Sequence, residues 1–320
     1  MAKPTAEPHD PAEPSRHLLD LGSLPADRIR AILASARAYA EAPPARRWDT
    51  LTGRFVANLF FEPSTRTRLS FTIAARRLGA EVVDLTSATS SVLKGETIAD
   101  TARTVQAMGV SAIVVRHGAS GAAELVADAV GCAVGCAVIN AGDGRHAHPT
   151  QALIDAYTVA EAHDRLAGFD LSGLRVGVVG DLTNSRVARS DIAAFTALGA
   201  EVVCIGPERL APRAFESLGC AVGHDLDPVL PNLDALQMLR VQTERGADAG
   251  KLREYPARFG LDDARVERLK PSAVILHPGP INRGAEITSA VVDSPRCLAL
   301  RQVALGVPVR MASIAHALGR

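Results

Sequence analysis

A group of hydroxyl and guanidinium side chains directly follows one apolar run of the chain. The segment STRTR, residues 64–68, comes after the run RFVANLFF, which begins at Arg54. The run predicts a strand, and the apolar spacing after STRTR predicts a helix, so Ser64 and Thr65 lie at the turn between them. A helix start presents unpaired N–H groups and partial positive charge, and Arg66 adds a charge-assisted donor. The segment predicts a phosphate site, and the alternative is a capped helix with a solvated arginine face.

A second polar segment, NAGDGRHAHPTQ, runs from Asn140 to Gln151. Its glycines predict a turn, and Pro149 after His148 predicts a helix that starts with imidazole and amide side chains nearby. We interpret His148 and Gln151 as binding residues. A structural role for His148 is one alternative, and a metal pair with His146 is another, although no third ligand is evident nearby.

Two arginines follow later apolar runs and could bind carboxylates. Arg186 comes shortly after LRVGVVGD, where a third glycine for a dinucleotide fingerprint is absent. A guanidinium group at a helix start can bind a carboxylate through two hydrogen bonds. Arg240 and Gln242 are two residues apart in LRVQ and would share one side of the chain as it leaves a strand. Solvated surface arginines are the alternative at both places.

Eight strand-like runs alternate with helical ones along the chain: GRFVANLFF, AEVVDL, SAIVVRH, CAVINA, LRVGVVGD, AEVVCIG, DALQMLR and SAVILHPG. This alternation predicts an α/β fold with parallel sheets and helices on both faces. Ligands collect at the carboxyl ends of such strands. We expect two α/β domains linked by a helix near His148 to Ala162, with the C-terminal helix packing back on the first domain. The expected divisions are a disordered tail (1–15), a first domain (16–148 with the helix 300–320) and a second domain (149–299).

The composition argues against several classes of protein, including nucleic-acid-binding, metal-binding and membrane proteins. Lys plus Arg and Asp plus Glu both number 35 in 320 residues, so no global basic field indicates nucleic acid. The five cysteines lack paired metal spacing and favour a reducing, cytoplasmic compartment. We expect no metal, because the duplicated AVGCAVGC has no metal partners in the sequence. Apolar runs stay below membrane-spanning length, and the Pro-rich start is unlike a signal peptide.

Seven motifs occur in one order between Glu62 and Pro280: STRTR, KGET, RH, HPTQ, GDL followed by SR, LRVQ, and HPGP. Together they resemble the aspartate and ornithine carbamoyltransferase family over nearly the whole chain beyond the tail. LRVQ and HPGP, with no SMG segment, are similar to the aspartate members. Arg240 would also repel the side-chain amine of ornithine. The alternatives are an ornithine or related carbamoyltransferase and a non-catalytic partner of dihydroorotase.

The resemblance implies the residues that bind carbamoyl phosphate. Its phosphate would be bound by Ser64, Thr65, Arg66, Thr67 and Arg116. Its carbonyl oxygen would accept from Thr67, Arg116 and His148, and its NH2 group would donate to Gln151 and to the backbone near Gly279 and Pro280. Among these, Arg66, Thr67, Arg116 and His148 are the implied catalytic residues, and no cofactor is implied.

The resemblance also implies how aspartate binds and how the chain assembles. The α-carboxylate of aspartate would contact Arg186, and its side-chain carboxylate would contact Lys94, Arg240 and Gln242. Ser90 and Lys94 resemble residues of a loop that reaches the neighbouring subunit's site, which implies a homotrimer. Glu62 resembles the acid that pairs with Arg186 and Arg245 on domain closure. Regulatory chains or dihydroorotase are possible further partners, and the implied pathway is pyrimidine biosynthesis.

Overall fold

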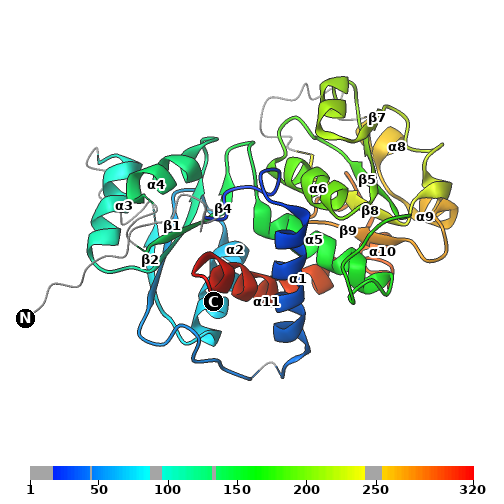
Figure 1. Ribbon diagram of the computed structural model, residues 1–320. Coiled ribbons are helices and arrows are strands. Elements are labelled where there is room, and N and C mark those ends of the chain that lie inside the picture. Colours follow the sequence, from blue (N-terminus) through cyan, green and yellow to red (C-terminus); the bar gives the residue numbers. More distant parts are fainter. Residues whose placement is uncertain (1–16, 44, 87–95, 132–134, 242–253) are drawn as a thin grey trace, which may run out of the picture. The chain divides into compact units, whose positions relative to one another are not determined.

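The fold is described from a computed structural model that covers residues 17–43, 45–86, 96–131, 135–241 and 254–320. Contacts group these residues into two compact units. Unit 1 holds the described residues of Met1–Leu19, Pro43–Gly144 and Arg310–Arg320, and unit 2 holds those of Asp20–Ala42 and Arg145–Val309. Both units are α/β, which confirms the predicted fold class (Figure 1).

The sheet of unit 1 is parallel throughout, with the strand order β2-β1-β3-β4. Its strands are β1 (Phe55–Phe60), β2 (Glu81–Thr86), β3 (Ala112–His117) and β4 (Ala137–Asp143). Phe60 at the end of β1 pairs with Arg116 near the end of β3. The segments that follow these two strands therefore leave the sheet at the same edge.

Helices cover both faces of this sheet: α2 (Thr65–Arg77), α3 (Ile98–Ala107) and α4 (Ala122–Val130). Alternate residues of a strand point to opposite faces. Leu59 packs in one apolar cluster with Val105 of α3 and Val126 of α4. Its neighbour Asn58 faces the other way and donates to Thr72 Oγ1 of α2 at 3.1 Å. Helices thus pack on both sides of the strands, as expected for a parallel sheet of an α/β unit.

The sheet of unit 2 is also parallel, with the order β7-β6-β5-β8-β9. Its strands are β5 (Arg175–Val179), β6 (Glu201–Ile205), β7 (Ala221–Gly223), β8 (Ala235–Met238) and β9 (Val274–Leu276). The sequence predicted all of these except β7. That strand has only three residues and lies at the sheet edge, so it shows too little apolar pattern to be recognised.

The helices of unit 2 are α1 (Ala26–Glu41), α5 (Pro149–Ala162), α6 (Arg186–Ala197), α8 (Tyr255–Phe259), α9 (Asp263–Arg268) and α10 (Ser289–Val292), with 3-10 turns η3 (Arg213–Leu218) and η4 (Leu230–Asn232). The expected linking helix near His148 corresponds to α5. Most of α5 is buried, which fits a helix in the middle of a unit.

Helix α1 groups with unit 2, whereas the sequence assigned it to the first domain by its position in the chain. Its buried face includes Ile29 and Leu33, and Arg37 Nη1 donates to the carbonyl of Leu166 at 3.2 Å. A segment early in the chain can thus belong to the later unit, because burial of an apolar helix face decides its partner and sequence position does not.

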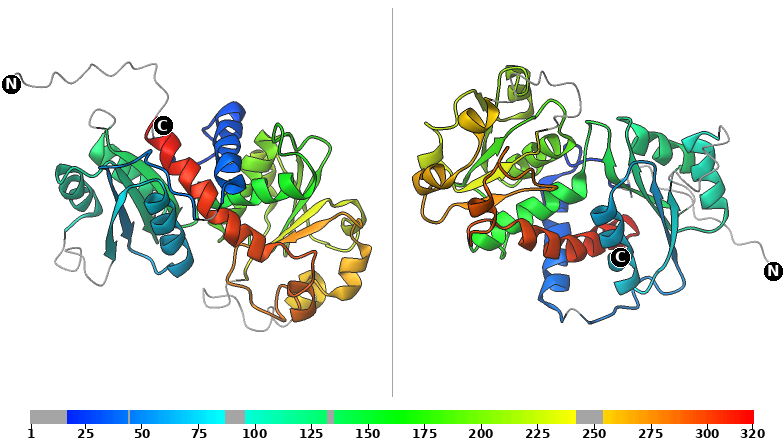
Figure 2. Two further views of the ribbon diagram at one scale, coloured as in Figure 1. Left: turned by 90° about the horizontal axis from the view of Figure 1, so that it is seen from below. Right: turned by 180° about the vertical axis from the view of Figure 1, so that it is seen from behind.

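Figure 2 shows the C-terminal helix α11 (Ala299–Ala317), in red, as one long helix. Its residues up to Val309 group with unit 2, and its residues from Arg310 group with unit 1. Arg310 lies 5.1 Å from the ring centre of Phe71 and donates to Ser70 Oγ at 2.9 Å, both on α2. These contacts confirm that the C-terminal helix packs back on the first α/β domain.

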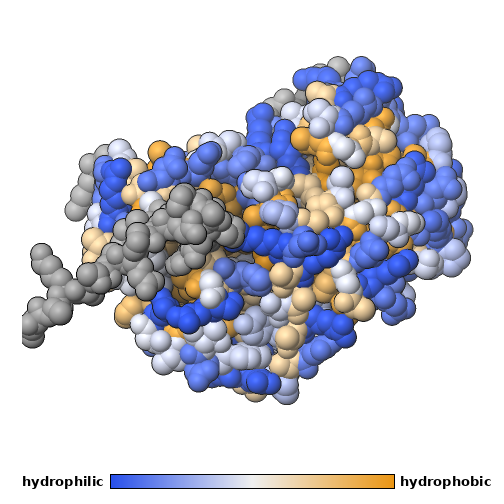
Figure 3. All heavy atoms as spheres, viewed as in Figure 1, coloured by the Kyte–Doolittle hydropathy of each residue, from blue (hydrophilic) through white to orange (hydrophobic). Residues whose placement is uncertain are grey.

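The outer surface is mixed in polarity. On the face drawn in Figure 3, hydrophilic residues are interspersed with smaller apolar areas. Among the helices that the structure describes, none is long and apolar enough to cross a membrane.

Candidate active site

The predicted phosphate loop of unit 1 has the expected strand–turn–helix geometry. β1 ends at Phe60 and α2 begins at Thr65, so Ser64 is the N-cap residue. Thr65 and Arg66 are exposed at this helix start, while Thr67 is buried. In the described part of the chain, the Ser64 side chain makes no capping hydrogen bond to α2. The hydroxyl and the first N–H groups of α2 are therefore available to an anion.

Arg116 lies at the same edge of the sheet as this loop. The pairing of β3 with β1 places Arg116 opposite Phe60, at the end of β1. The backbone carbonyl of Arg116 also accepts from Phe61 N at 2.9 Å. Arg116 Nη1 donates to the carbonyl of Ala141 at 3.1 Å, which orients the guanidinium group. Glu62 Oε1 is 3.8 Å from Arg116 Nη2. Within unit 1, Glu62 thus has Arg116 as an ionic neighbour, and its predicted pairing with Arg186 and Arg245 stays a prediction.

The end of β4 is shaped by buried polar groups at the start of the polar segment Asn140 to Gln151. Asn140 Nδ2 donates to Asp143 Oδ1 at 2.7 Å, and Asp143 Oδ2 accepts from Gly121 N at 2.7 Å. Gly144 has φ +46°, and a Cβ there would lie 2.2 Å from Ser120 N. Only glycine fits this close approach. These residues fix the loop that follows β4, beside the strand that carries Arg116.

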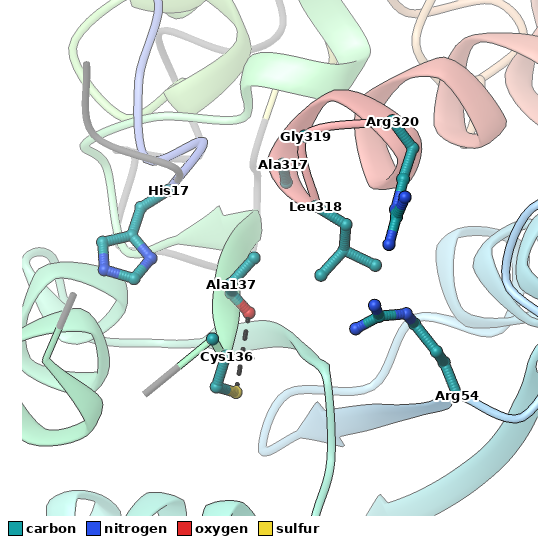
Figure 4. A pocket seen from close by; sticks show the side chains of 9 residues that line it. His17, Arg54, Cys136, Ala137, Ala317, Leu318, Gly319 and Arg320 are labelled. Atoms are coloured by element: carbon teal, nitrogen blue, oxygen red, sulfur yellow. Dashed lines mark hydrogen bonds between the residues drawn. The ribbon is translucent and has the colours of Figure 1, made fainter. Parts of the chain in front are cut away.

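A pocket of about 400 Å³ lies elsewhere in unit 1 (Figure 4). Arg54 precedes β1 and Cys136 and Ala137 lie at the start of β4, so this pocket is at the amino ends of the strands. The phosphate loop lies at their carboxyl ends. The pocket is therefore a separate feature and not the predicted anion site.

In unit 2, His148 is the N-cap of α5 and Pro149 is its first residue, which confirms the predicted helix start. His148 is buried, and its backbone N–H donates to Ser190 Oγ of α6 at 2.8 Å. Gln151 follows in the first turn and is partly exposed. Among the described residues, no group of three His, Cys, Asp or Glu side chains could bind a metal ion, so His146 and His148 gain no third ligand there.

Arg186 begins α6 and is buried at 9 % exposure. Its helix start is capped by Ser185, whose Oγ accepts from Ala188 N at 3.1 Å. The preceding turn is closed by Asp181, which accepts from the backbone and side chain of Asn184. Arg189 Nη1 donates to the carbonyls of Leu182 and Ser185, both at 3.2 Å, and burial lowers the pKa of Arg189. The segment that carries Arg186 is thus internally fixed.

Arg240 follows β8, and β8 pairs with β5, the strand before Arg186. Because the two strands are parallel neighbours, the segments with Arg186 and Arg240 leave the sheet at the same edge. Four other predicted site residues, Ser90, Lys94, Gln242 and Arg245, lie outside the described residues.

The loop after β9 carries Gly279 and Pro280 and is fixed by His277. His277 Nδ1 accepts from Gly279 N at 2.8 Å, so the ring proton is on Nε2, which lies 3.1 Å from Glu286 Oε1. Glu286 Oε1 also accepts from Asn282 N at 2.7 Å. Both ends of the loop are thereby tied to one buried carboxylate. The sequence indicated the loop through its Pro-Gly-Pro turn but gave no sign of Glu286.

Comparisons with known proteins show the family to which the chain belongs. Residues 16–161 match the family model for the aspartate/ornithine carbamoyltransferase carbamoyl-P binding domain, and residues 172–317 match that for the Asp/Orn binding domain. The chain is 50% identical over 308 residues to the aspartate carbamoyltransferase catalytic subunit of Acidothermus cellulolyticus, covering 95% of this chain and 93% of the relative. It is 50% identical over 302 residues to the catalytic subunit of Myxococcus xanthus, covering 93% and 97%.

Two solved structures to which this chain is similar are also aspartate transcarbamoylases. Aspartate transcarbamoylase from Trypanosoma cruzi in complex with carbamoyl phosphate and aspartate has a TM-score of 0.82 at 29% identity, covering 94% of this chain and 96% of that chain. The catalytic subunit of M. Jannaschii aspartate transcarbamoylase has a TM-score of 0.82 at 32% identity, covering 95% and 98%.

Proposed function

Because this chain belongs to the aspartate/ornithine carbamoyltransferase family, we propose that it transfers the carbamoyl group of carbamoyl phosphate to the amino group of L-aspartate. The products are N-carbamoyl-L-aspartate and phosphate, in an early step of pyrimidine biosynthesis. The observation that carries the proposal is the uncapped start of α2 next to Arg116 at one sheet edge of unit 1. That arrangement suits a phosphate group.

The phosphate subsite in this proposal consists of Ser64, Thr65, Arg66, Thr67 and Arg116. The hydroxyls and helix N–H groups donate to the phosphate oxygens, and the two guanidinium groups balance its charge. The exposure of Thr65 and Arg66 supports this role, because an exposed helix start can be reached by a ligand.

The carbamoyl group is bound through complementary donors and acceptors. We assign His148, Thr67 and Arg116 as donors to its carbonyl oxygen, and Gln151 with the backbone near Gly279 and Pro280 as acceptors for its NH2 group. The first turn of α5 supports the assignment within unit 2, since His148 and Gln151 lie in the same helix start.

Aspartate is bound by cationic and amide groups, with Arg186 for the α-carboxylate and Arg240 with Gln242 and Lys94 for the side-chain carboxylate. The parallel pairing of β5 with β8 supports this assignment, because it brings the segments with Arg186 and Arg240 to one edge of unit 2. A dicarboxylate suits two such cations, whereas the side-chain amine of ornithine does not.

The reaction proceeds by attack of the aspartate amine on the carbonyl carbon. A C–N bond forms, the carbonyl oxygen takes up negative charge, and the C–O bond to phosphate then breaks with its electron pair leaving on phosphate. The amine loses one proton, which the departing phosphate accepts. Preorganised donors stabilise the charge on both oxygens, and this is the main contribution of the protein in the proposed mechanism.

We further propose that the chain forms a homotrimer in the cytoplasm, in which Ser90 and Lys94 reach the neighbouring subunit's site. The free thiols of Cys136, Cys204, Cys220 and Cys297 support a reducing compartment. We include in this proposal a higher assembly of the trimer with regulatory chains or dihydroorotase.

One assay tests the proposed activity. The purified chain is given carbamoyl phosphate with either L-aspartate or L-ornithine, and the carbamoylated product and phosphate are measured. We expect turnover with aspartate only. Turnover with ornithine alone would assign the chain to the other substrate of the family, and absence of turnover with both would favour the non-catalytic partner of dihydroorotase.

A further inference from the structure

One fully buried carboxylate of unit 2 collects hydrogen bonds from three glutamine side chains. Asp155, on α5, is 0% exposed. Its Oδ1 accepts from Gln151 Nε2 at 2.8 Å and from Gln302 Nε2 at 2.7 Å, and its Oδ2 accepts from Gln237 Nε2 at 3.0 Å. The three amides come from α5, α11 and β8. Through these hydrogen bonds, the Asp155 carboxylate links α5, α11 and β8.

A second buried carboxyl group, that of Asp191 on α6, lies against Asp155. Among the described residues, neither oxygen of Asp191 has a hydrogen-bond partner that would stabilise a charge. Burial, followed by the charge of the neighbouring Asp155, raises the pKa of Asp191 well above its ordinary value. The raised pKa favours the neutral form of Asp191, so that the negative charge of the pair lies on Asp155.

The chemistry of this acceptor determines which way the Gln151 amide faces. An ionised carboxylate only accepts hydrogen bonds, whereas a glutamine amide has one donating and one accepting end. Gln151 lies one helical turn before Asp155 and points its NH2 group at the carboxylate. Its Oε1 must then face the other side, toward the partly exposed start of α5.

The same carboxylate is linked to the loop with Gly279. Gln302 donates to Asp155 with its amide nitrogen and accepts from His277 N at 2.9 Å with its amide oxygen. His277 Nδ1 in turn accepts from Gly279 N at 2.8 Å. A continuous chain of hydrogen bonds thus runs from Asp155 to both elements assigned to the carbamoyl NH2 group.

We propose that Asp155 is a positioning residue for substrate selection: by binding the Gln151 amide nitrogen it directs Gln151 Oε1 to accept from the carbamoyl NH2 group. The site then selects carbamoyl phosphate over acyl phosphates with a methyl group in that place, such as acetyl phosphate. This inference rests on the proposed function. A methyl group cannot donate to Oε1, and a buried acceptor left without a donor weakens binding.

The test compares two substitutions at the same position. Asp155→Leu has nearly the same shape and removes the acceptor, so the Gln151 amide can turn. Asp155→Asn keeps an acceptor oxygen toward Gln151, and its new NH2 group can donate to Gln237 Oε1, which has no partner among the described residues, once that amide turns. For each variant we measure KM for carbamoyl phosphate and the inhibition constants of acetyl phosphate and inorganic phosphate.

In the wild-type enzyme, we expect carbamoyl phosphate to be strongly preferred over acetyl phosphate. Asp155→Leu should reduce that preference by about tenfold or more, with inorganic phosphate inhibition unchanged, and Asp155→Asn should retain it. In a Gln151→Met background, Asp155→Leu should cause no further loss of preference, because the residue acts through Gln151. A purely structural role would lower thermal stability and leave the preference intact.

Each outcome decides between the possibilities. An unchanged preference in folded Asp155→Leu overturns the inference while leaving the proposed activity intact. A wild-type chain that does not use carbamoyl phosphate overturns the proposed function instead. If Asp155→Leu does not fold, it is combined with Asp191→Leu and Gln237→Leu, since replacing several members of a buried polar cluster by apolar side chains costs less than leaving each of them unpaired. The same loss of preference is then required.

Discussion

Two helices of this molecule begin at serines after a strand, and they use those serines differently. Ser185 caps α6 by accepting from Ala188 N at 3.1 Å. Thr97 and Thr288 cap α3 and α10 in the same way. In the described chain, Ser64 makes no such bond to α2. A hydroxyl that caps a helix stabilises the fold, whereas a hydroxyl that does not is available to a ligand.

The arginines that follow these two serines differ in their exposure to solvent. Arg66 is exposed at the start of α2, while Arg186 is buried behind a turn that is closed by its own hydrogen bonds. Unit 1 thus presents open donors at its candidate phosphate site, and unit 2 presents side chains fixed by internal networks. The helix start with Arg66 thus keeps its hydroxyl donor open to a ligand, whereas the segment that carries Arg186 is already held by hydrogen bonds of the protein itself.

The largest expected effect is that of Arg66→Ala. The exposed side chain contributes little to folding, but its loss removes a charged partner of the phosphate. We expect turnover to fall by about a hundredfold or more, which corresponds to roughly 3 kcal/mol, with thermal stability unchanged. Arg76→Ala, at an exposed position in the last turn of α2, is the matched control. Activity close to wild type in Arg66→Ala would remove the phosphate site from the α2 start.

A mixing experiment tests whether the site is shared between subunits. Lys94→Ala and Arg66→Ala chains should each be inactive alone. After dissociation and joint reassembly, about a quarter of the sites in a trimer should pair an intact Arg66 with an intact Lys94 from the neighbour. Activity should therefore return in part. Subunit exchange without any return of activity would place Lys94 in its own chain's site or in a structural role.

Arg240→Ala tests the proposed aspartate subsite of unit 2. The change removes a carboxylate partner and leaves the phosphate donors intact. We expect KM for aspartate to rise by about tenfold or more while KM for carbamoyl phosphate stays constant. Arg213→Ala, on the exposed turn η3, serves as the control. A weakened carbamoyl phosphate affinity in Arg240→Ala would show that the two subsites are wrongly divided.

The raised pKa of the buried Asp191 in unit 2 predicts a dependence of stability on pH. The folded state keeps a proton on Asp191 that the unfolded state releases above its ordinary pKa, so folding binds a proton and stability falls as pH rises toward the folded pKa. The amide side chain in Asp191→Asn is neutral at every pH, so its folding binds no proton at this position. We expect the free energy of unfolding of this variant to gain on wild type by up to about 1.4 kcal/mol per pH unit above pH ~4. Denaturant unfolding at several pH values measures it, and parallel curves would show that Asp191 is ionised.

The sequence predicted most of the fold, and it indicated candidate site residues at the ends of strands. Apolar runs located eight of the nine described strands, and turn chemistry located the starts of α2 and α5. Residues such as Arg66 and Arg186 were recognisable because charged groups directly after apolar runs lie at strand ends.

The residues that position the site were not predicted. Asp155, Gln302 and Glu286 lie inside helices or loops, far apart in sequence, and no local spacing marks them as partners. A single acidic residue in an apolar helix gives no sign of which amides will surround it. Their roles follow only from tertiary packing, as does the placement of α1 in unit 2.

The smallest expected effects come from the two serines, and they test the opening comparison directly. Ser185→Ala removes a cap and should lower the free energy of unfolding by about 1 kcal/mol. Ser64→Ala removes no described capping bond, so its stability should stay within about 0.5 kcal/mol of wild type. Its KM for carbamoyl phosphate should rise several-fold, because one donor to the phosphate is lost. Denaturant unfolding and steady-state kinetics on both variants measure the two quantities. If Ser64→Ala lost stability and kept its affinity for carbamoyl phosphate, Ser64 would be an ordinary cap, and the start of α2 would differ from that of α6 in appearance only.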